Sequence, residues 1–251
     1  MLNAITGQDK NLYKQFKEEL PAAQEVKIIV AFLKESGVKL IVDDLKKQAL
    51  KGAEIKIITG RYLNITEPAA LYLLKDRLGD MVELRFYNDD AISFHPKAYF
   101  LEKEEEKVLF IGSSNISKAA LTDGVEWNYR MLEEQDEASY EEFEREFERI
   151  FSQETTEIDR QELKSYARQW TKPEVEIVEE SAIEDGESTA PEPRGAQIEA
   201  LHELRLARKE GIKKGLVIAA TGVGKTYLAA FDSMEFDKIL FVAHREEILR
   251  Q

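Results

Sequence analysis

Strand-length apolar runs alternate with helical patterns in the amino-terminal part of this chain. Residues 26–32, 54–59 and 82–87 each have the length and composition of a buried strand. Between them, apolar side chains recur at spacings of three and four over 36–50 and 66–78, which predicts two helices. Strands that alternate with helices predict a largely parallel sheet with helices on its faces. The expected fold class is therefore α/β.

A histidine and a lysine stand two positions apart at the start of the next apolar run, as His95 and Lys97. Side chains two apart on an extended segment point to the same side. A charged turn at 103–107 separates this run from a second one at 108–111, which predicts a β-hairpin, and residues 112–115 read Gly-Ser-Ser-Asn. An imidazole, an ammonium, hydroxyls and a carboxamide therefore meet at one end of the predicted sheet. That set of groups can hold a phosphate and attack it.

The order His-x-Lys followed by Gly-Ser-Ser-Asn resembles the HxKxxxxD…GSxN signature of the phospholipase D superfamily, whose members include nucleases as well as lipid hydrolases. Glu102 stands where the signature has Asp, and the gap from Glu102 to Gly112 is a few residues longer. The resemblance continues at 122–128, where Glu126 takes the position of a supporting acid. It implies a mixed-sheet α/β/α sandwich.

The resemblance also implies a metal-independent phosphodiesterase. His95 would attack phosphorus and form a covalent phosphohistidine. Lys97, Asn115 and one serine of the Ser-Ser pair, Ser113, would hold the phosphate oxygens, and Glu126 would orient the imidazole. Sites of this family use two His-x-Lys motifs, with one histidine as nucleophile and the other as general acid, and this sequence supplies one. A homodimer that joins two copies of His95 across a two-fold axis is therefore expected.

A glycine-rich loop lies in the carboxy-terminal part of the chain, between apolar runs at 216–220 and 238–243 that predict strands. The loop reads Thr-Gly-Val-Gly-Lys-Thr, and a helix is expected from Tyr227. In such a unit, backbone N–H groups cradle phosphates, the lysine reaches the outer ones and the threonine ligates Mg²⁺. The expected nucleotide-binding residues of the loop are Thr221, Gly222, Gly224, Lys225 and Thr226.

With Ala219 at its first position, the loop resembles the P-loop of superfamily 2 DEAD/DEAH-box helicases. Residues 194–197 resemble their adenine-reading Gln motif, which makes Gln197 a further nucleotide-binding candidate, and residues 241–249 resemble motif Ia. The resemblance stops at Gln251, before the acid that holds Mg²⁺ and aligns water. An incomplete RecA-like P-loop unit is therefore expected, with weak nucleotide binding and no ATP turnover. ATP and Mg²⁺ would be cofactors of the full-length helicase.

The formal charge of −14 is concentrated in the middle of the chain. Residues 131–192 carry six Lys and Arg against 21 Asp and Glu, and within them 137–151 has apolar residues at helical spacing. The outer segments are close to neutral, so the overall acidity does not exclude nucleic acid as a partner. Three parts are expected: a phospholipase D-like nuclease domain at 1–152, an acidic helical segment and linker at 153–192, and a truncated helicase motor at 193–251.

Composition excludes several other classes of protein. The chain has no cysteine, which excludes disulfides and thiolate metal sites, and its three histidines are too few for a His-rich zinc cluster. No apolar run is long enough to span a membrane, and no signal sequence opens the chain. A cytoplasmic protein without a membrane partner is expected.

Together these features predict a nuclease that acts on nucleic acid, DNA rather than RNA, as the amino-terminal part of a helicase-nuclease of restriction or defence type. Two alternatives stay open. A non-catalytic DNA-docking or dimerisation module is favoured by Glu102 at the Asp position and by the low local basicity. A lipid or transferase phosphodiesterase would carry the same His-x-Lys motif, although the helicase motifs argue against it.

Overall fold

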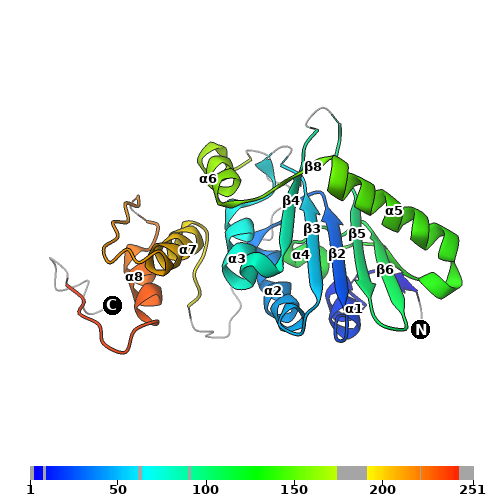
Figure 1. The fold of residues 1–251 in the computed structure, drawn as a ribbon, viewed down its shortest axis with the longest axis horizontal. Coiled ribbons are helices and arrows are strands. Elements are labelled where there is room, and N and C mark those ends of the chain that lie inside the picture. Colours follow the sequence, from blue (N-terminus) through cyan, green and yellow to red (C-terminus); the bar gives the residue numbers. More distant parts are fainter. Residues whose placement is uncertain are drawn as a thin grey trace. The chain divides into compact units, whose positions relative to one another are not determined.

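The structure is a computed structural model, and it describes residues 3–7, 10–61, 64–89, 92–173, 191–220 and 222–242. They form two compact units, one within Met1–Glu184 and one within Asp185–Gln251 (Figure 1). Each unit is described by itself.

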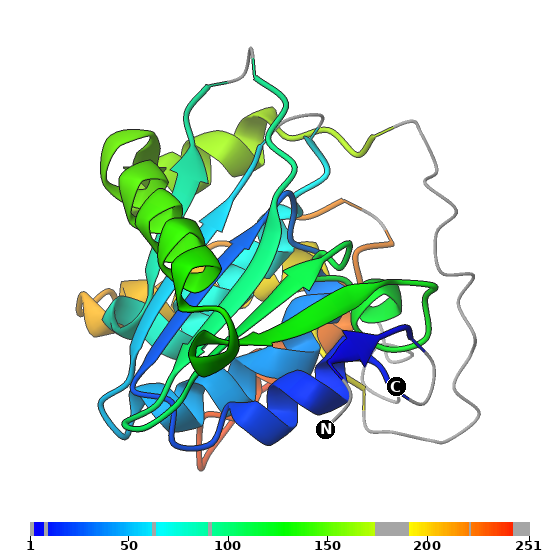
Figure 2. The ribbon, with the colours of Figure 1, turned by 90° about the vertical axis from the view of Figure 1, so that its right-hand side faces the viewer.

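The first unit is built on one mixed sheet of eight strands in the order β1-β7-β6-β5-β2-β3-β4-β8 (Figures 1 and 2). Strands β2, β3 and β4 are parallel, as the alternation of strands and helices predicted, but the other five pairings are antiparallel. The expectation of a largely parallel sheet was therefore wrong, whereas the α/β fold class and the mixed sheet are confirmed. The strands are β1 (Ala4–Ile5), β2 (Glu25–Val30), β3 (Glu54–Thr59), β4 (Glu83–Tyr87), β5 (Lys97–Glu102), β6 (Lys107–Gly112), β7 (Asn128–Leu132) and β8 (Thr155–Glu157).

Helices cover both faces of this sheet. One helix, α5, crosses one face (Figure 2), and the other helices form a contiguous layer in which α2 packs on α3 and α4, α1 on α4, and α6 on α3. Tyr99 contacts Phe16 of α1 and Phe86 contacts Tyr166 of α6, which places this layer on the face away from α5. The helices are α1 (Leu12–Glu19), α2 (Glu35–Ala49), α3 (Pro68–Leu78), α4 (Lys118–Leu121), α5 (Glu137–Gln153) and α6 (Arg160–Gln169).

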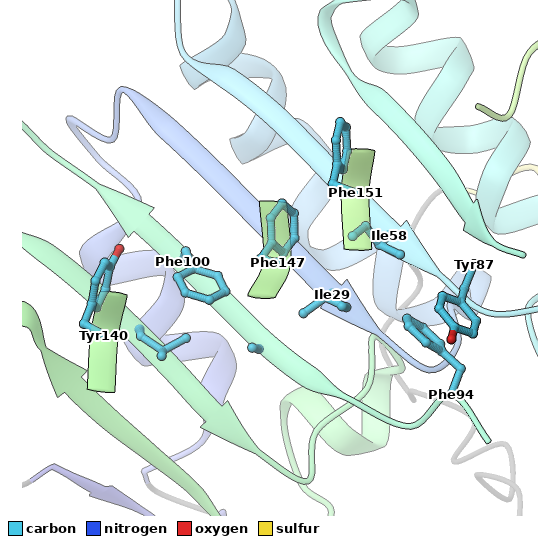
Figure 3. Packing of buried hydrophobic residues seen from close by; sticks show 10 residues of the cluster. Ile29, Ile58, Tyr87, Phe94, Phe100, Tyr140, Phe147 and Phe151 are labelled. Carbon is cyan, nitrogen blue, oxygen red and sulfur yellow. The ribbon is translucent and has the colours of Figure 1, made fainter. Parts of the chain in front are cut away.

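Aromatic side chains attach α5 to the sheet. Tyr140, Phe147 and Phe151 recur at spacings of seven and four, so they share one side of the helix, and all three are buried. Figure 3 shows them over the sheet near Ile29 and Phe100. The Phe100 ring lies edge-on to Tyr140 and Phe147, with centroids 5.8 and 5.7 Å apart. Such contacts add about 0.5–1.5 kcal/mol each beyond the buried area.

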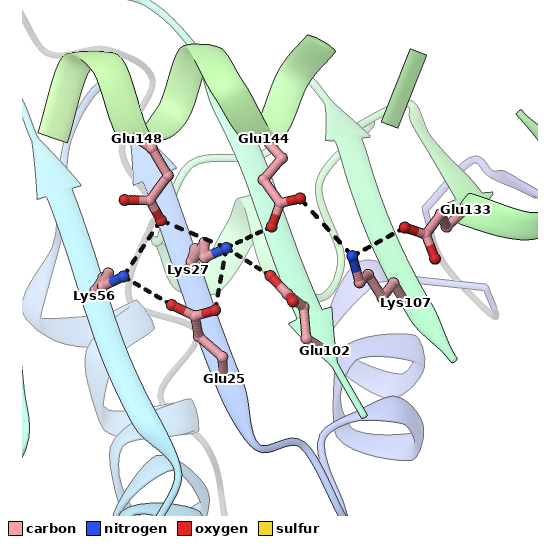
Figure 4. Close-up of polar contacts among 8 residues, drawn as sticks. All are labelled: Glu25, Lys27, Lys56, Glu102, Lys107, Glu133, Glu144 and Glu148. Carbon is pink, nitrogen blue, oxygen red and sulfur yellow. Dashed lines mark hydrogen bonds and ion pairs between the residues drawn. The ribbon is translucent and has the colours of Figure 1, made fainter. Parts of the chain in front are cut away.

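A partly buried ion network also attaches the sheet-facing side of α5 to the strands (Figure 4). The Lys27 side chain is 4% exposed, and its Nζ lies 2.6 Å from carboxylate oxygens of Glu102 and Glu144 and 3.1 Å from Glu25. Burial and the neighbouring Glu144 raise the pKa of Glu102 to about 7. Burial acts to lower the pKa of Lys27, but its hydrogen bonds to Glu102 and Glu144 outweigh burial and raise that pKa. Lys27 therefore remains charged and joins β2, β5 and α5.

Glu102 belongs to this network and not to the neighbourhood of His95. It ends β5, whereas Lys97 begins that strand, roughly 17 Å away at the usual rise per residue. The residue at the signature Asp position therefore has a structural place here. Its difference from Asp gives no support to the non-catalytic alternative.

The first unit extends beyond the boundary expected at residue 152. Strand β8 pairs with β4 in the register Phe86↔Thr156, and Ile158 N donates to Leu84 O at 2.8 Å. Helix α6 follows and packs on α3. This stretch was expected to begin an acidic helical segment and linker outside the first domain. Helix α6 supplies the helix, but β8 joins the sheet through backbone pairing, which composition does not report. Most of the expected linker, residues 174–190, lies outside the described residues.

The second unit contains helices α7 (Ala196–Lys209) and α8 (Lys225–Ser233). The strands expected at 216–220 and 238–243 do not form in the part that the structure describes, which ends at residue 242. Leu216, Ile218 and Leu240 are 85–88% exposed there. A strand exists only when a neighbouring strand takes its N–H and C=O groups, and no such neighbour lies beside these runs among the described residues. The expectation of these two strands was therefore wrong for this structure.

Candidate active site

One end of the sheet gathers the residues expected at the first site. Strand pairing puts the last residue of β2 beside Lys97 at the start of β5, through the register Val30↔Lys97. The predicted β5/β6 hairpin is confirmed, with Ala98 opposite Ile111, so β6 ends at the same edge. There Gly112 pairs with Asn128, the first residue of β7. His95, Lys97, Ser113, Asn115 and Glu126 all belong to segments that meet at this edge.

His95 and Lys97 are in direct contact. Lys97 Nζ lies 2.5 Å from Nδ1 and 3.3 Å from Nε2 of the imidazole, and it donates to the His95 carbonyl at 2.8 Å. Burial and the positive charge of Lys97 lower the pKa of His95 below its ordinary value of 6.5. Burial also lowers the pKa of Lys97, and the Glu126 carboxylate acts in the opposite direction. The imidazole is therefore neutral at pH 7, the form that can act as a nucleophile.

Ser113 and Glu126 form a second polar pair at this edge. The Ser113 hydroxyl donates to the Glu126 carboxylate and accepts from Trp127 N at 3.0 Å, and Ser113 N donates to Trp127 O at 3.0 Å. Glu126 was expected to orient the His95 imidazole, but its hydrogen-bond partner in the structure is Ser113. The carboxylate acts on the His95 side of the site through its charge, which offsets part of the lowering of the Lys97 pKa by burial.

The two serines of the Ser-Ser pair have different environments. Ser114 is fully buried, accepts from Asn128 Nδ2 at 2.8 Å, and its carbonyl accepts from the Tyr99 hydroxyl at 2.9 Å. Ser113 is exposed at the sheet edge. Ser113 is therefore the serine that a ligand can reach, and Ser114 holds the loop to β7. Asn128 was not among the expected site residues, although it ends the 122–128 segment that resembles the family.

Asn115 joins two of the converging segments. Its side chain is buried, and its Oδ1 accepts a hydrogen bond from Phe32 N, just beyond β2, at 3.2 Å. The close packing here also explains Gly112, because a Cβ at this position would lie 2.2 Å from Trp127 O and 2.6 Å from the Asn128 Cα. Any side chain at Gly112 would therefore push β7 away from the site.

The described residues contain no group of three or more His, Asp or Glu side chains placed to hold a metal ion. None of the helices in the described segments is long and apolar enough to cross a membrane.

The predicted nucleotide-binding residues lie together in the second unit, except Thr221, which is outside the described residues. Gln197 Nε2 donates to the carbonyls of Val223 and Gly224 at 2.9 and 3.2 Å. Gly224 has φ = 78°, and a Cβ there would meet Gln197 Nε2 at 2.6 Å. The side chain of the expected adenine-reading residue thus packs directly against the loop.

Lys225 and Thr226 begin α8 directly after the two glycines, Gly222 and Gly224. Lys225 Nζ donates to the carbonyls of Ala219 and Ala220 at 3.2 and 2.9 Å, so the ammonium lies over the loop. This is a loop–helix start of the kind that receives phosphates. Residues 243–249 of the expected motif Ia lie outside the described residues.

Two family models match separate parts of the chain. The model described as "Cardiolipin synthase, PLD-like domain" matches residues 17–151, and the one described as "Type III restriction enzyme, res subunit" matches residues 190–251. A search of curated proteins found no match.

Solved structures that this chain resembles include two bacterial proteins. One is Nuc from Salmonella typhimurium, a phospholipase D family member, at 17% identity and a TM-score of 0.44, covering 57% of this chain and 88% of that one. The other is NucT from Helicobacter pylori, at 15% identity and a TM-score of 0.45, covering 57% and 89%.

Proposed function

We propose, because the chain belongs to the family of cardiolipin synthase, PLD-like domains, that its first unit is a nuclease that cleaves phosphodiester bonds of nucleic acid. The observation that carries the proposal is the contact of Lys97 Nζ with the His95 imidazole, whose pKa is lowered. A neutral imidazole beside an ammonium is suited to attack a phosphate that the ammonium holds. Resemblance to the family motif gives His95 the role of nucleophile.

The proposed reaction has two steps. A nitrogen of His95 attacks phosphorus, the bond from phosphorus to the leaving oxygen breaks, and the leaving oxygen takes a proton from a general acid. A water molecule then attacks the phosphohistidine, gives its proton to the acid-base group, and releases the phosphate product and neutral His95. Lys97 and Asn115 stabilise the negative charge on the phosphate oxygens during both steps, and Ser113 is a further donor once its hydroxyl leaves Glu126.

The substrate class is proposed from the second part of the chain. Residues 190–251 match the model of a type III restriction enzyme subunit, and the Gln197 and Lys225 contacts fit a nucleotide-binding loop. A nuclease joined to such a unit fits DNA rather than RNA as substrate, in a restriction or defence role. ATP and Mg²⁺ would serve the second unit alone.

Cleavage is expected to survive removal of divalent metal ions, since the proposed nucleophile and charge-stabilising groups are all side chains of the protein. The measurement is the rate of cleavage of a fluorescent DNA oligonucleotide by the whole chain, before and after dialysis against EDTA. The expected rate is the same within error. A rate that falls with EDTA and returns with Mg²⁺ or Mn²⁺ would contradict the proposed chemistry.

The general acid is proposed to be His95 of a second copy, so the active form is a homodimer with both histidines in one site. Mixing the wild-type chain with His95→Ala, under conditions of subunit exchange, should then lower activity with the square of the wild-type fraction. His202→Gln, which alters a histidine of the second unit, is the control and should not inhibit in this way. Activity that falls in direct proportion to the wild-type fraction, together with a monomeric mass in light scattering, would refute a shared site.

A further inference from the structure

A pocket of about 520 Å³ opens beside His95, on the face of the sheet that α5 covers. Its size lies in the range of roughly 300–1,000 Å³ that small-molecule sites occupy. The walls come from α5, from the inner strands and from the segment before β5, and most of the lining side chains are apolar. Figure 3 shows part of this wall, with Phe94 and Tyr87 at one end and Phe147 and Ile29 beside them.

Aromatic rings give this pocket flat surfaces. Phe94 stacks on Tyr87 with ring centroids 4.4 Å apart and an interplanar angle of 17°, which fixes the Phe94 ring next to His95. Phe143 also lines the pocket, and it is 40% exposed although Tyr140 and Phe147 on the same helix are buried. An exposed ring in a pocket wall is free to stack against a planar ligand.

The pocket also has a polar rim. Arg149 donates to Glu146 at 2.7 and 2.8 Å and to Glu154 at 2.6 Å, and all three residues line the pocket. The guanidinium offsets part of the carboxylate charge and places donors next to acceptors. An acyl chain cannot form hydrogen bonds with such groups, whereas a nucleobase has flat apolar faces and a polar edge with both donors and acceptors.

We infer that this pocket holds the base next to the cleaved phosphate of a single-stranded nucleic acid, with its face on Phe143 and its polar edge toward Arg149. The inference rests on the proposed function, because it takes His95 and Lys97 as the groups that engage the phosphate. A base in a duplex is stacked and paired, so it cannot enter a pocket without leaving the helix. The pocket therefore favours cleavage of single strands over duplexes of the same sequence.

The test uses the whole chain and a DNA oligonucleotide with one cleavable linkage, made with and without an abasic residue beside that linkage. Loss of the base is expected to lower kcat/KM of the wild type about five- to a hundredfold, the usual size of one base–aromatic contact. Phe143→Ala should lower kcat/KM on the intact oligonucleotide to a similar extent. On the abasic oligonucleotide, kcat/KM of this variant should be close to that of the wild type. Its exposure makes this substitution compatible with folding.

A matched pair of arginine variants distinguishes the effect of the pocket rim on base binding from the general effect of removing a positive charge from α5. Arg145 and Arg149 both lie on α5 and both bond to the glutamate three residues earlier, but Arg145 does not line the pocket. Arg149→Ala should reduce the penalty for removing the base, and Arg145→Ala should leave it as in the wild type. Equal penalties in the two variants would overturn the placement of the base edge.

The outcomes distinguish the pocket from the proposed function. Cleavage of intact and abasic oligonucleotides at equal rates, still dependent on His95, would overturn the pocket inference and leave the nuclease standing. Failure of the wild type to cleave either oligonucleotide would reject the nuclease and the pocket inference with it. Stronger inhibition by dioctanoyl phosphatidylglycerol than by an uncleavable single-stranded oligonucleotide would assign the pocket to acyl chains instead.

Discussion

Replacing His95 with alanine is expected to abolish cleavage of DNA, with a loss in kcat of about 10⁴-fold or more, as for removal of other enzymatic nucleophiles. The reason is that no covalent phosphohistidine can form without the imidazole. Rapid denaturation during turnover should trap a protein–oligonucleotide adduct in the wild type and none in His95→Ala. Thermal unfolding should be little changed, because His95 lies before β5 and is only partly buried.

The pH profile provides a second readout of the same residue. Burial and Lys97 lower the pKa of His95, so the neutral nucleophile persists to a pH below the ordinary imidazole value of 6.5. The limb of the pH profile in which the rate declines through protonation of the nucleophile should therefore lie at a pH below 6.5. His202→Gln is the control histidine and should leave the profile unchanged. Undiminished cleavage by His95→Ala would contradict the proposed function.

Replacing Lys27 with alanine is expected to lower the free energy of unfolding by about 3–5 kcal/mol. Lys27 is the shared cation of Glu25, Glu102 and Glu144, and its removal leaves their negative charges close together in a partly buried place. Urea denaturation of the wild type and the variant, with helix content as the signal, measures the difference. The matched control is Lys47→Ala, whose 67% exposed side chain pairs with Asp44 on the surface and should contribute about 0.5 kcal/mol or less.

The loss caused by Lys27→Ala should shrink as the pH falls from 8 to 5. Without Lys27, the carboxylates of Glu25, Glu102 and Glu144 are expected to have higher pKa values in the folded state than in the unfolded state. Groups of this kind stabilise the folded state at low pH, and that stabilisation is lost as the pH rises. Glu102 already has a pKa of about 7 beside Lys27, so it takes up a proton within this range. A triple variant with Lys27→Met, Glu102→Gln and Glu144→Gln should recover much of the loss. A loss below 1 kcal/mol at pH 8 would show that the network does not hold α5.

The local pattern of the sequence determined most of the secondary structure in the first unit. Apolar runs of strand length predicted β2, β3, β4 and, with the charged turn between them, the β5/β6 hairpin, while apolar spacings of three and four predicted α2 and α3. Both signals depend only on near neighbours in the sequence. The contact of His95 with Lys97 was also predictable, because side chains two residues apart on an extended segment point to the same side. The place of the loop glycines is also determined locally, because Gly222 and Gly224 have positive φ angles, which glycine adopts most readily.

The tertiary structure decided which distant side chains share an environment. Glu126 bonds Ser113, Asn128 holds Ser114, and Glu102 joins Lys27 because the strand order places β7, β6, β5 and β2 side by side. No local signal specifies that order, which depends on the burial and backbone pairing of the whole sheet. The same reason explains the unformed strands at 216–220 and 238–242, since an apolar run becomes a strand only where another strand pairs with it. The pocket beside His95 likewise exists only because α5 crosses the sheet above residues far from it in sequence.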